Sequence, residues 1–382
     1  MTPADLSRTV LHAVRRAVDE DALRAPVPAR VRVERTRPGG SGDYACAVAL
    51  QLAGPAALPA LEVARILRER VAAEPGVGRV EITGPGFLSF TLDAPAESDR
   101  AVLAAVREQG LAYGHGDALR DEIHQFHHAR EVRAAVTAQA VRRLLVAQGA
   151  RVRTTCEQAP DPDWVRLGVT VDAYGTPPTP LTGIRPVPAG ATAGELLERL
   201  GPDAARWGLL RAAGHDRAAL GPELLVQGEA NPLFRVRYAH ARARALTRGA
   251  AALGFTAEAA PYGESPSGPA AHGASPAAQA ANAAPTATTA HDAAARPLLD
   301  LIADHPGVLL AGARHRAPDR VARQLEAVAH AFFDFHDSCP PLPAGDEKPS
   351  AAHRTRLAIA EAAGTVLAGG LSLLGIRAPE HL

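Results

Sequence analysis

The hydrophobic pattern of this chain changes along its length, and the change limits the folds that the chain can adopt. Near the N-terminus, apolar residues at helical spacing predict three helices, over 6–18, from Pro59 to about Pro75, and over 97–109. Short apolar segments bounded by Gly and Pro predict four strands, at 31–34, 44–52, 79–83 and 87–92. The order α-β-β-α-β-β-α predicts an α+β N-terminal domain, residues 1–113, with helices on one side of an antiparallel sheet.

The rest of the chain is first mixed and then helical. In a middle α/β region, residues 120–213, the pattern predicts helices at 131–148 and 193–211, a strand at 151–153 and a loop at 172–190. From Pro222 to residue 382 helical spacing dominates, which predicts an all-α helical bundle. One tract inside it, 256–295, is rich in Ala, Pro, Ser and Gly, and we expect a disordered insertion because such a composition buries too little apolar surface to offset the entropy of ordering.

Composition narrows the class of protein. The 382 residues are 47% hydrophobic and carry no formal net charge, which indicates a globular protein of two or three domains and counts mildly against nucleic-acid binding. Three scattered cysteines without a C-x-x-C pair argue against a disulfide framework or a zinc site and suit a reducing cytoplasm. There is no signal-peptide pattern and no run of roughly 18 apolar residues, so we expect a cytoplasmic protein that binds neither membrane nor metal. The only lysine is Lys348, which excludes lysine chemistry elsewhere.

Two motifs lie in the helical region. Asn231-Pro232 is followed by Tyr238-Ala-His-Ala-Arg242, and the chain closes on the stretch from Gly370 to Glu380, GLSLLGIRAPE. Together they resemble the DALR-type anticodon-binding helical domain of arginyl-tRNA synthetases, and the resemblance implies an all-α anticodon-binding bundle at residues 222–382. The family usually ends in PERM, whereas this chain ends Pro-Glu-His-Leu, which puts the terminal contacts to the anticodon in doubt.

Three residues of this region are candidates for tRNA binding: Arg235, Tyr238 and Arg242. Arg235 and Arg242 are seven residues apart and therefore share a helix face. Arginines with an interleaved aromatic ring suit an unstacked anticodon loop, because rings stack on bases and guanidinium groups bind phosphates. The alternative is an ordinary solvated helix face.

The N-terminal domain resembles the additional N-terminal domain of the same synthetases. The resemblance rests on Gly42-Asp-Tyr-Ala and on the segment 84–90, GPGFLSF. It implies contact with the D-loop of tRNA, where the family pattern GFxN supplies a ring and an amide. Phe87 matches the ring, whereas Ser89 stands at the amide position and offers fewer hydrogen bonds. The alternative for Phe87 is a residue of the sheet core.

The middle region resembles fragments of the class I synthetase catalytic domain, whose signature H-V-G-H becomes His128, Ala129, Arg130 and Glu131. The resemblance implies loss of the ATP site, because arginine replaces the glycine on which adenine lies and glutamate replaces a phosphate-binding histidine. The second signature loop would fall on Thr182–Arg185, which has no lysine. About thirty residues separate Arg153 from Thr182, too few for a complete nucleotide-binding fold. For His124, His127 and His128, a polar loop before a helix is preferred to metal binding.

These patterns support three hypotheses. The first is an arginyl-tRNA synthetase-related protein with a degenerate, truncated catalytic remnant, which binds the D-loop and anticodon arm of tRNA, has no catalytic residues and needs no cofactor. The second is an active arginine–tRNA ligase, for which ATP would be required. The third is an interaction module whose partner is another protein, such as a true synthetase.

Overall fold

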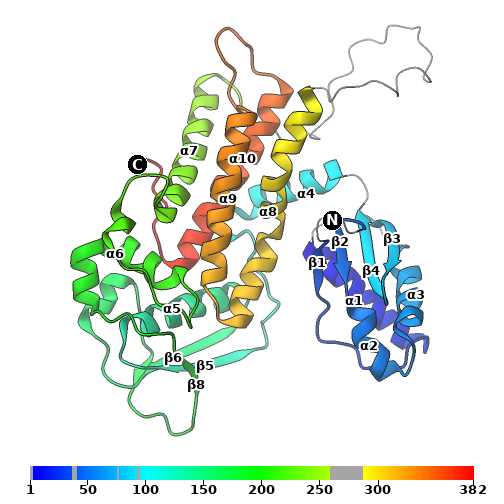
Figure 1. Ribbon diagram of the computed structural model, residues 1–382, viewed down its shortest axis with the longest axis horizontal. Coiled ribbons are helices and arrows are strands. Elements are labelled where there is room, and N and C mark those ends of the chain that lie inside the picture. Colours follow the sequence, from blue (N-terminus) through cyan, green and yellow to red (C-terminus); the bar gives the residue numbers. More distant parts are fainter. Residues whose placement is uncertain (1–2, 37–40, 75–76, 93–94, 259–286) are drawn as a thin grey trace. The chain divides into compact units, whose positions relative to one another are not determined.

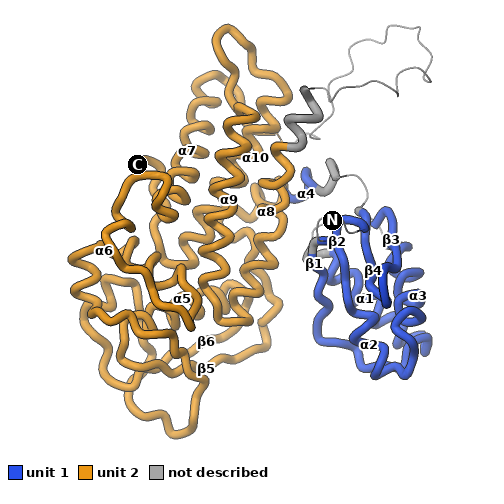
Figure 2. The backbone as a smooth tube through the Cα atoms, viewed as in Figure 1, with its two compact units in different colours: residues 1–102 blue, residues 103–382 orange. Residues whose placement is uncertain are grey.

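The structure is a computed structural model that describes residues 3–36, 41–74, 77–92, 95–258 and 287–382 (Figure 1). The chain divides into two compact units, residues 1–102 and residues 103–382 (Figure 2). Helix α4, Pro95–Gln109, runs across the boundary between them. Each unit is described by itself.

The N-terminal unit is a four-stranded antiparallel sheet covered by helices. The strands β1 (Val33–Arg35), β2 (Tyr44–Cys46), β3 (Val77–Thr83) and β4 (Phe87–Leu92) are arranged in the order β1-β2-β4-β3. Its helices are α1 (Pro3–Asp19), α2 (Val48–Ala56) and α3 (Ala60–Val71). They pack on the sheet face that carries the fully buried Leu88 and Phe90. The predicted α+β fold is confirmed.

One predicted strand of this unit is wrong in extent. The segment 44–52 was expected to be a single strand, but only Tyr44–Cys46 pairs in the sheet and α2 follows at once. Its buried residues, Val48, Ala49, Leu52 and Ala56, recur at helical spacing, so the apolar run fits a helix better than a continuous strand.

The first part of the second unit is built on a parallel sheet. The strands β5 (Ile123–His128), β6 (Arg151–Cys156), β7 (Ala173–Tyr174) and β8 (Thr182–Ile184) are arranged in the order β7-β6-β5-β8. Helix α5 (Val132–Ala147) connects β5 to β6, and α6 (Ala193–Arg211) follows β8. The α/β middle region is thus confirmed.

Two expectations for this region need correction. The segment 172–190 was read as loop, yet it contains β7 and β8, which at two and three residues are too short to show an alternating pattern. His124, His127 and His128 were read as a polar loop, but they lie in β5. Parallel pairing with β6 and β8, which comes from distant parts of the chain, makes this polar segment a strand.

The remaining helices form a bundle. They are α7 (Pro232–Ala252), α8 (Ala287–His315), α9 (Asp319–Ser338) and α10 (Ala351–Leu374), and Figure 1 shows the four side by side. Short 3₁₀ helices lie between the other elements of the chain. They are η1 (Gly110–Ala112) after α4, η2 (Pro162–Leu167) between β6 and β7, and η3 (Pro222–Leu225) between α6 and α7. The all-α C-terminal region is confirmed. Helix α8 begins inside the tract for which disorder is predicted, so the end of that tract is helical, whereas residues 259–286 lie outside the described residues.

Helix α10 lies at the centre of this bundle. Its length and apolar composition would suffice to cross a membrane, as would the sharply bent pair α2 and α3 taken as one span. However, 78% of the most apolar window of α10 is buried inside the protein, which is the arrangement of a core helix.

A buried arginine joins the bundle to the parallel-sheet part. Arg206 of α6 donates two hydrogen bonds to the carbonyl oxygen of Leu374, at 2.9 and 2.7 Å, and another to that of Leu167. Burial, with a smaller effect of the neighbouring Arg143, lowers the pKa of Arg206 to about 9. Carbonyl oxygens at the ends of η2 and α10 therefore replace the water that this guanidinium loses on folding.

Candidate functional site

The three predicted residues of the helical region meet in one cavity. Arg235, Tyr238 and Arg242 line a cavity of about 590 Å³ between α7 and α9, which is within the usual range for ligand sites. We call it the α7–α9 groove, and its lining is Gly228, Glu229, Phe234, Arg235, Tyr238 and Arg242 from the α7 side and His330, Phe333, Asp334, His336 and Asp337 from α9. Arg235 and Arg242 therefore share a face of α7, as their seven-residue spacing predicts, and Tyr238 lines the same cavity.

A stack of aromatic rings lies along this groove. The ring of Tyr238 stacks on Phe234 at a centroid distance of 5.6 Å and on Phe333 of α9 at 5.5 Å, in both cases nearly parallel. Tyr238 is nevertheless 44% exposed. The stack holds the tyrosine ring in place at the wall of the cavity.

Both arginines of the groove contact histidines, and neither forms an ion pair with a carboxylate of the residues that the structure describes. Arg235 Nη2 lies 2.9 Å from His330 Nδ1, and Arg242 donates from Nε to His336 Nε2 at 3.4 Å. Behind each histidine lies an aspartate, with 3.6 Å from His330 Nε2 to Asp334 and 3.2 Å from His336 Nδ1 to Asp337. These α9 residues were not among the sequence candidates, although His330, Phe333, Asp334 and Asp337 recur at helical spacing.

The two candidates of the N-terminal unit lie on one strand but differ in accessibility. Phe87 begins β4 and is 37% exposed, on the sheet face opposite Leu88 and Phe90, so it is not a core residue. Ser89 lies on the same face but is only 4% exposed, and its hydroxyl is 2.9 Å from that of Thr83. Phe87 is thus free to meet a ligand, whereas the serine hydroxyl already has a partner.

The four residues of the altered signature lie at the carboxyl end of β5, where parallel α/β sheets commonly bind ligands. His128 is 2% exposed, its Nδ1 lies 2.9 Å from the carbonyl oxygen of Ala129, and burial lowers its pKa. Arg130 donates from Nε to the carbonyl oxygen of Ala159 at 2.8 Å. Each polar side chain of this set is therefore bonded to the protein itself.

Glu131 closes the N-terminus of α5. One carboxylate oxygen accepts a hydrogen bond from the amide of Ala134 and the other from the amide of Ala189, both at 2.8 Å. A carboxylate is favourable there because the first amides of a helix lack partners and the helix dipole favours negative charge. The position that could bind a ligand anion therefore holds an anion of the protein.

Arg133, the second residue of α5, is also bonded to the protein itself. Its side chain is 1% exposed, and burial lowers its pKa. The guanidinium donates to five carbonyl oxygens at 2.6–3.0 Å, those of Val187, Leu209, Ala212, Ala213 and Asp216. It thereby connects α5 to the end of α6, and its N–H groups are used in these bonds and are not available to a ligand.

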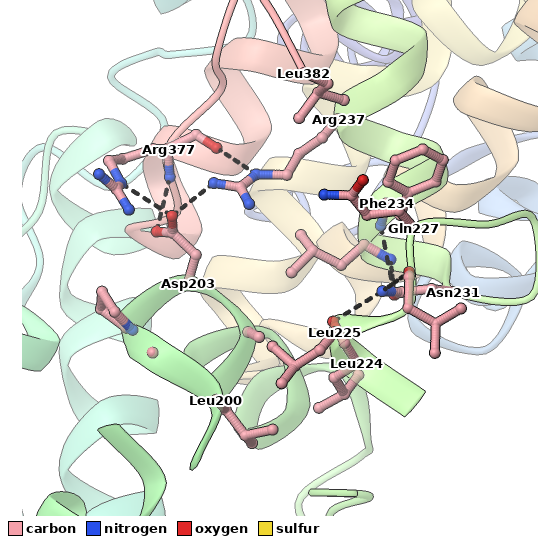
Figure 3. A pocket seen from close by; sticks show the side chains of 15 residues that line it. Leu200, Asp203, Leu224, Leu225, Gln227, Asn231, Phe234, Arg237, Arg377 and Leu382 are labelled. Atoms are coloured by element: carbon pink, nitrogen blue, oxygen red, sulfur yellow. Dashed lines mark hydrogen bonds and ion pairs between the residues drawn. The ribbon is translucent and has the colours of Figure 1, made fainter. Parts of the chain in front are cut away.

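A smaller cavity of about 280 Å³ lies between α6, η3 and the start of α7 (Figure 3). Figure 3 shows Arg237 and Arg377 both directed to Asp203, at 2.6 and 2.9 Å. Asn231 caps α7 by accepting from the amide of Leu233, and its side-chain amide donates to two carbonyl oxygens, of Leu224 and Val226. The Asn-Pro motif and the C-terminal segment thus serve to fix the bundle.

Among the described residues, no group of three or more His, Cys, Asp or Glu side chains could hold a metal ion. Cys46, Cys156 and Cys339 are buried, and these three described cysteines form no disulfide with one another.

In comparison with known proteins, both the N-terminal and the C-terminal part of the chain match domains of known families. Residues 270–382 match the DALR anticodon binding domain, and residues 5–92 match the arginyl tRNA synthetase N-terminal domain. Curated relatives include the arginine–tRNA ligase of Frankia alni, 26% identical over an alignment of 579 positions that covers both chains, and that of Pseudarthrobacter chlorophenolicus, 34% identical over 189 residues, 49% of this chain and 30% of the relative.

Solved structures agree in fold. Thermus thermophilus arginyl-tRNA synthetase superposes with a TM-score of 0.66 at 14% identity, covering both chains fully. A putative arginyl-tRNA synthetase from Campylobacter jejuni superposes with a TM-score of 0.55 at 10% identity, covering 75% of this chain and all of the other.

Proposed function

The chain belongs to the arginyl-tRNA synthetase family, with that family's N-terminal and DALR anticodon-binding domains, and from this premise we propose that it binds tRNA without aminoacylating it. In this proposal the α7–α9 groove contacts the anticodon arm and the exposed face of β4 at Phe87 contacts the D-loop. The protein acts in the cytoplasm and requires no cofactor.

The observation that carries tRNA binding is the α7–α9 groove. It combines an aromatic stack with two arginines whose charges are not neutralised by a direct carboxylate bond. Single-stranded RNA is held by stacking of unpaired bases and by guanidinium contacts to phosphates, and both groups are present within one cavity. The lining also contains three carboxylates, those of Glu229, Asp334 and Asp337, so phosphate binding here depends on the two guanidinium groups themselves and not on a net positive charge of the groove.

The absence of catalysis is supported by the β5–α5 junction. Class I synthetases bind ATP there, and in this chain Glu131, Arg130 and Arg133 are bonded to the protein's own backbone. The Glu131 carboxylate would also repel a triphosphate at short range. In addition, the chain has 382 residues, whereas its alignment with the Frankia alni ligase spans 579 positions. The sole lysine, Lys348, belongs to the segment between α9 and α10 and not to the β5–α5 junction.

Two assays test the proposal. Arginine-dependent exchange of pyrophosphate into ATP by the purified protein should stay at background, and tRNA binding should weaken steeply as salt rises, because phosphate contacts release counterions. Exchange above background would establish the second candidate, an active arginine–tRNA ligase, which is the activity for which these relatives are named. If the folded protein fails to bind any tRNA, the interaction with another protein becomes the better explanation.

A further inference from the structure

The α7–α9 groove contains two three-residue chains of the same kind. In each, an arginine of α7 contacts a histidine of α9, and the other ring nitrogen of that histidine faces an aspartate. The first chain is Arg235–His330–Asp334 and the second is Arg242–His336–Asp337. The aspartates lie behind the histidines and not on the arginines.

The contact with arginine selects one tautomer of each histidine. A guanidinium has only donors, so the ring nitrogen bonded to it acts as the acceptor, and the ring proton lies on the nitrogen that faces the aspartate. His330 therefore carries its proton on Nε2 and accepts through Nδ1, whereas His336 carries it on Nδ1 and accepts through Nε2. The other charged group of the lining is Glu229.

A neutral acceptor has a specific consequence for the arginine. The bond to histidine uses one of the five N–H groups of each guanidinium, restricts its rotamers and leaves its charge in place. A direct aspartate would instead take the bidentate face that a phosphate needs. Arg235 and Arg242 are also seven residues apart, about 10 Å along the helix axis, with Tyr238 between them.

We propose that His330 and His336 are positioning residues, which hold Arg235 and Arg242 ready for two phosphates of a single-stranded RNA segment whose intervening base meets the aromatic stack. This rests on the proposed function of the groove. Fixing two flexible side chains before binding removes part of the ordering cost that RNA binding would otherwise carry.

The test uses the full chain and unfractionated tRNA. His330→Ala and His336→Ala should each weaken binding about two- to tenfold, the ordering cost of one long side chain. Two matched variants restore the acceptor: the side-chain oxygen in His330→Asn takes the place of Nδ1, and the oxygen in His336→Gln takes the place of Nε2. Both should bind within about twofold of the unmodified protein, since an amide also donates to the aspartate.

A double-mutant cycle separates positioning from simple structural support. If His330 acts through Arg235, then His330→Ala should change affinity little in a chain that already carries Arg235→Ala, and the same holds for His336 with Arg242. Melting temperatures of all variants identify any that do not fold.

The outcomes distinguish this inference from the proposed function. If Arg242→Ala weakens binding while folded His336→Ala and His330→Ala bind normally, the positioning role is wrong and the groove still binds RNA. The positioning role would also be wrong if the losses of affinity caused by the histidine and arginine substitutions were additive in the double variants. If neither arginine matters in a folded protein, the proposed function of the groove fails first.

Discussion

At the scale of single residues, Tyr238 connects the aromatic stack to the cavity. Replacing Tyr238 by Ala should weaken tRNA binding by about 1–3 kcal/mol if a base stacks against this ring system. Tyr238→Phe is the matched control, because it keeps the contacts to Phe234 and Phe333 and removes only the hydroxyl. Affinity should be measured by titration beside the melting temperature. Equal affinity of folded Tyr238→Ala and the unmodified protein would contradict the stacking role.

Arg242 tests the phosphate contact separately. Arg242→Ala should reduce the slope of log affinity against log salt by roughly one contact and weaken binding similarly for different tRNA sequences. Its contact with His336 also connects α7 to α9, so a fall in melting temperature with an unchanged salt slope would show that the arginine serves the bundle instead.

The role of Glu131 as the cap of α5 can be tested by protein stability alone, without RNA. Glu131→Ala removes the acceptor of two amides and should lower the free energy of unfolding by about 0.5–2 kcal/mol, the cost of a lost helix cap. Glu131→Gln retains one acceptor oxygen and should lose less. Denaturant unfolding of the full chain measures both, and an unchanged midpoint for Glu131→Ala would show that the cap does not matter.

At the scale of elements, the packing of α8 on α9 should depend on pH. His305 of α8 is completely buried beside Gln324, at 2.7 Å, and burial lowers the pKa of this histidine from 6.5 to about 4. The folded protein therefore keeps His305 neutral where the unfolded chain becomes protonated. Stability from this group is full above pH 6.5, falls as pH drops from 6.5 towards 4, and falls no further below that.

The size of this pH effect is at most on the order of 3 kcal/mol, from the difference between the two pKa values. Urea unfolding at several pH values should show the loss, and His305→Gln should flatten the curve in that window while keeping a donor for Gln324. A curve with the same slope in the variant would assign the pH dependence to other groups.

The segment 259–286 is expected to be dispensable for stability and for tRNA binding. Its Ala-, Pro-, Ser- and Gly-rich composition predicts that it contributes little burial, so replacing it by a short Gly-Ser linker should leave the melting temperature and tRNA affinity nearly unchanged. The replacement should stop before Ala287, where α8 begins. A large loss of stability would show that the segment packs on the bundle.

At the scale of the whole molecule, two modest contacts on one tRNA combine through effective concentration. Phe87→Ala should therefore weaken the binding of intact tRNA by about 1–3 kcal/mol if a base stacks on this ring. The same variant should bind an isolated anticodon stem–loop normally, since that RNA lacks a D-loop, whereas Tyr238→Ala should weaken both. If Phe87→Ala weakens the binding of both RNAs equally, Phe87 supports the structure of the protein and does not contact the D-loop.

Much of this architecture follows from local patterns. Strand β4 was predicted with its observed limits, and the helices α5 and α6 within a few residues, because periodicity is a property of neighbouring residues. For the same reason Arg235 and Arg242 could be placed on one face of α7 before any contact was known, with Tyr238 between them in sequence. The sequence alone thus determined the succession of an α+β, an α/β and an all-α part and the shared helix face of Arg235 and Arg242.

Only the tertiary structure decided what these residues meet. His330 lies 95 positions from Arg235, and the second amide bound by Glu131 lies 58 positions away, so no local pattern could show either contact. Strands β7 and β8 exist because neighbouring strands supply their hydrogen bonds, and Ser89 is withdrawn from the surface by Thr83. Hydrogen bonds and burial join residues that are distant in sequence, and their effect appears only when the chain is folded.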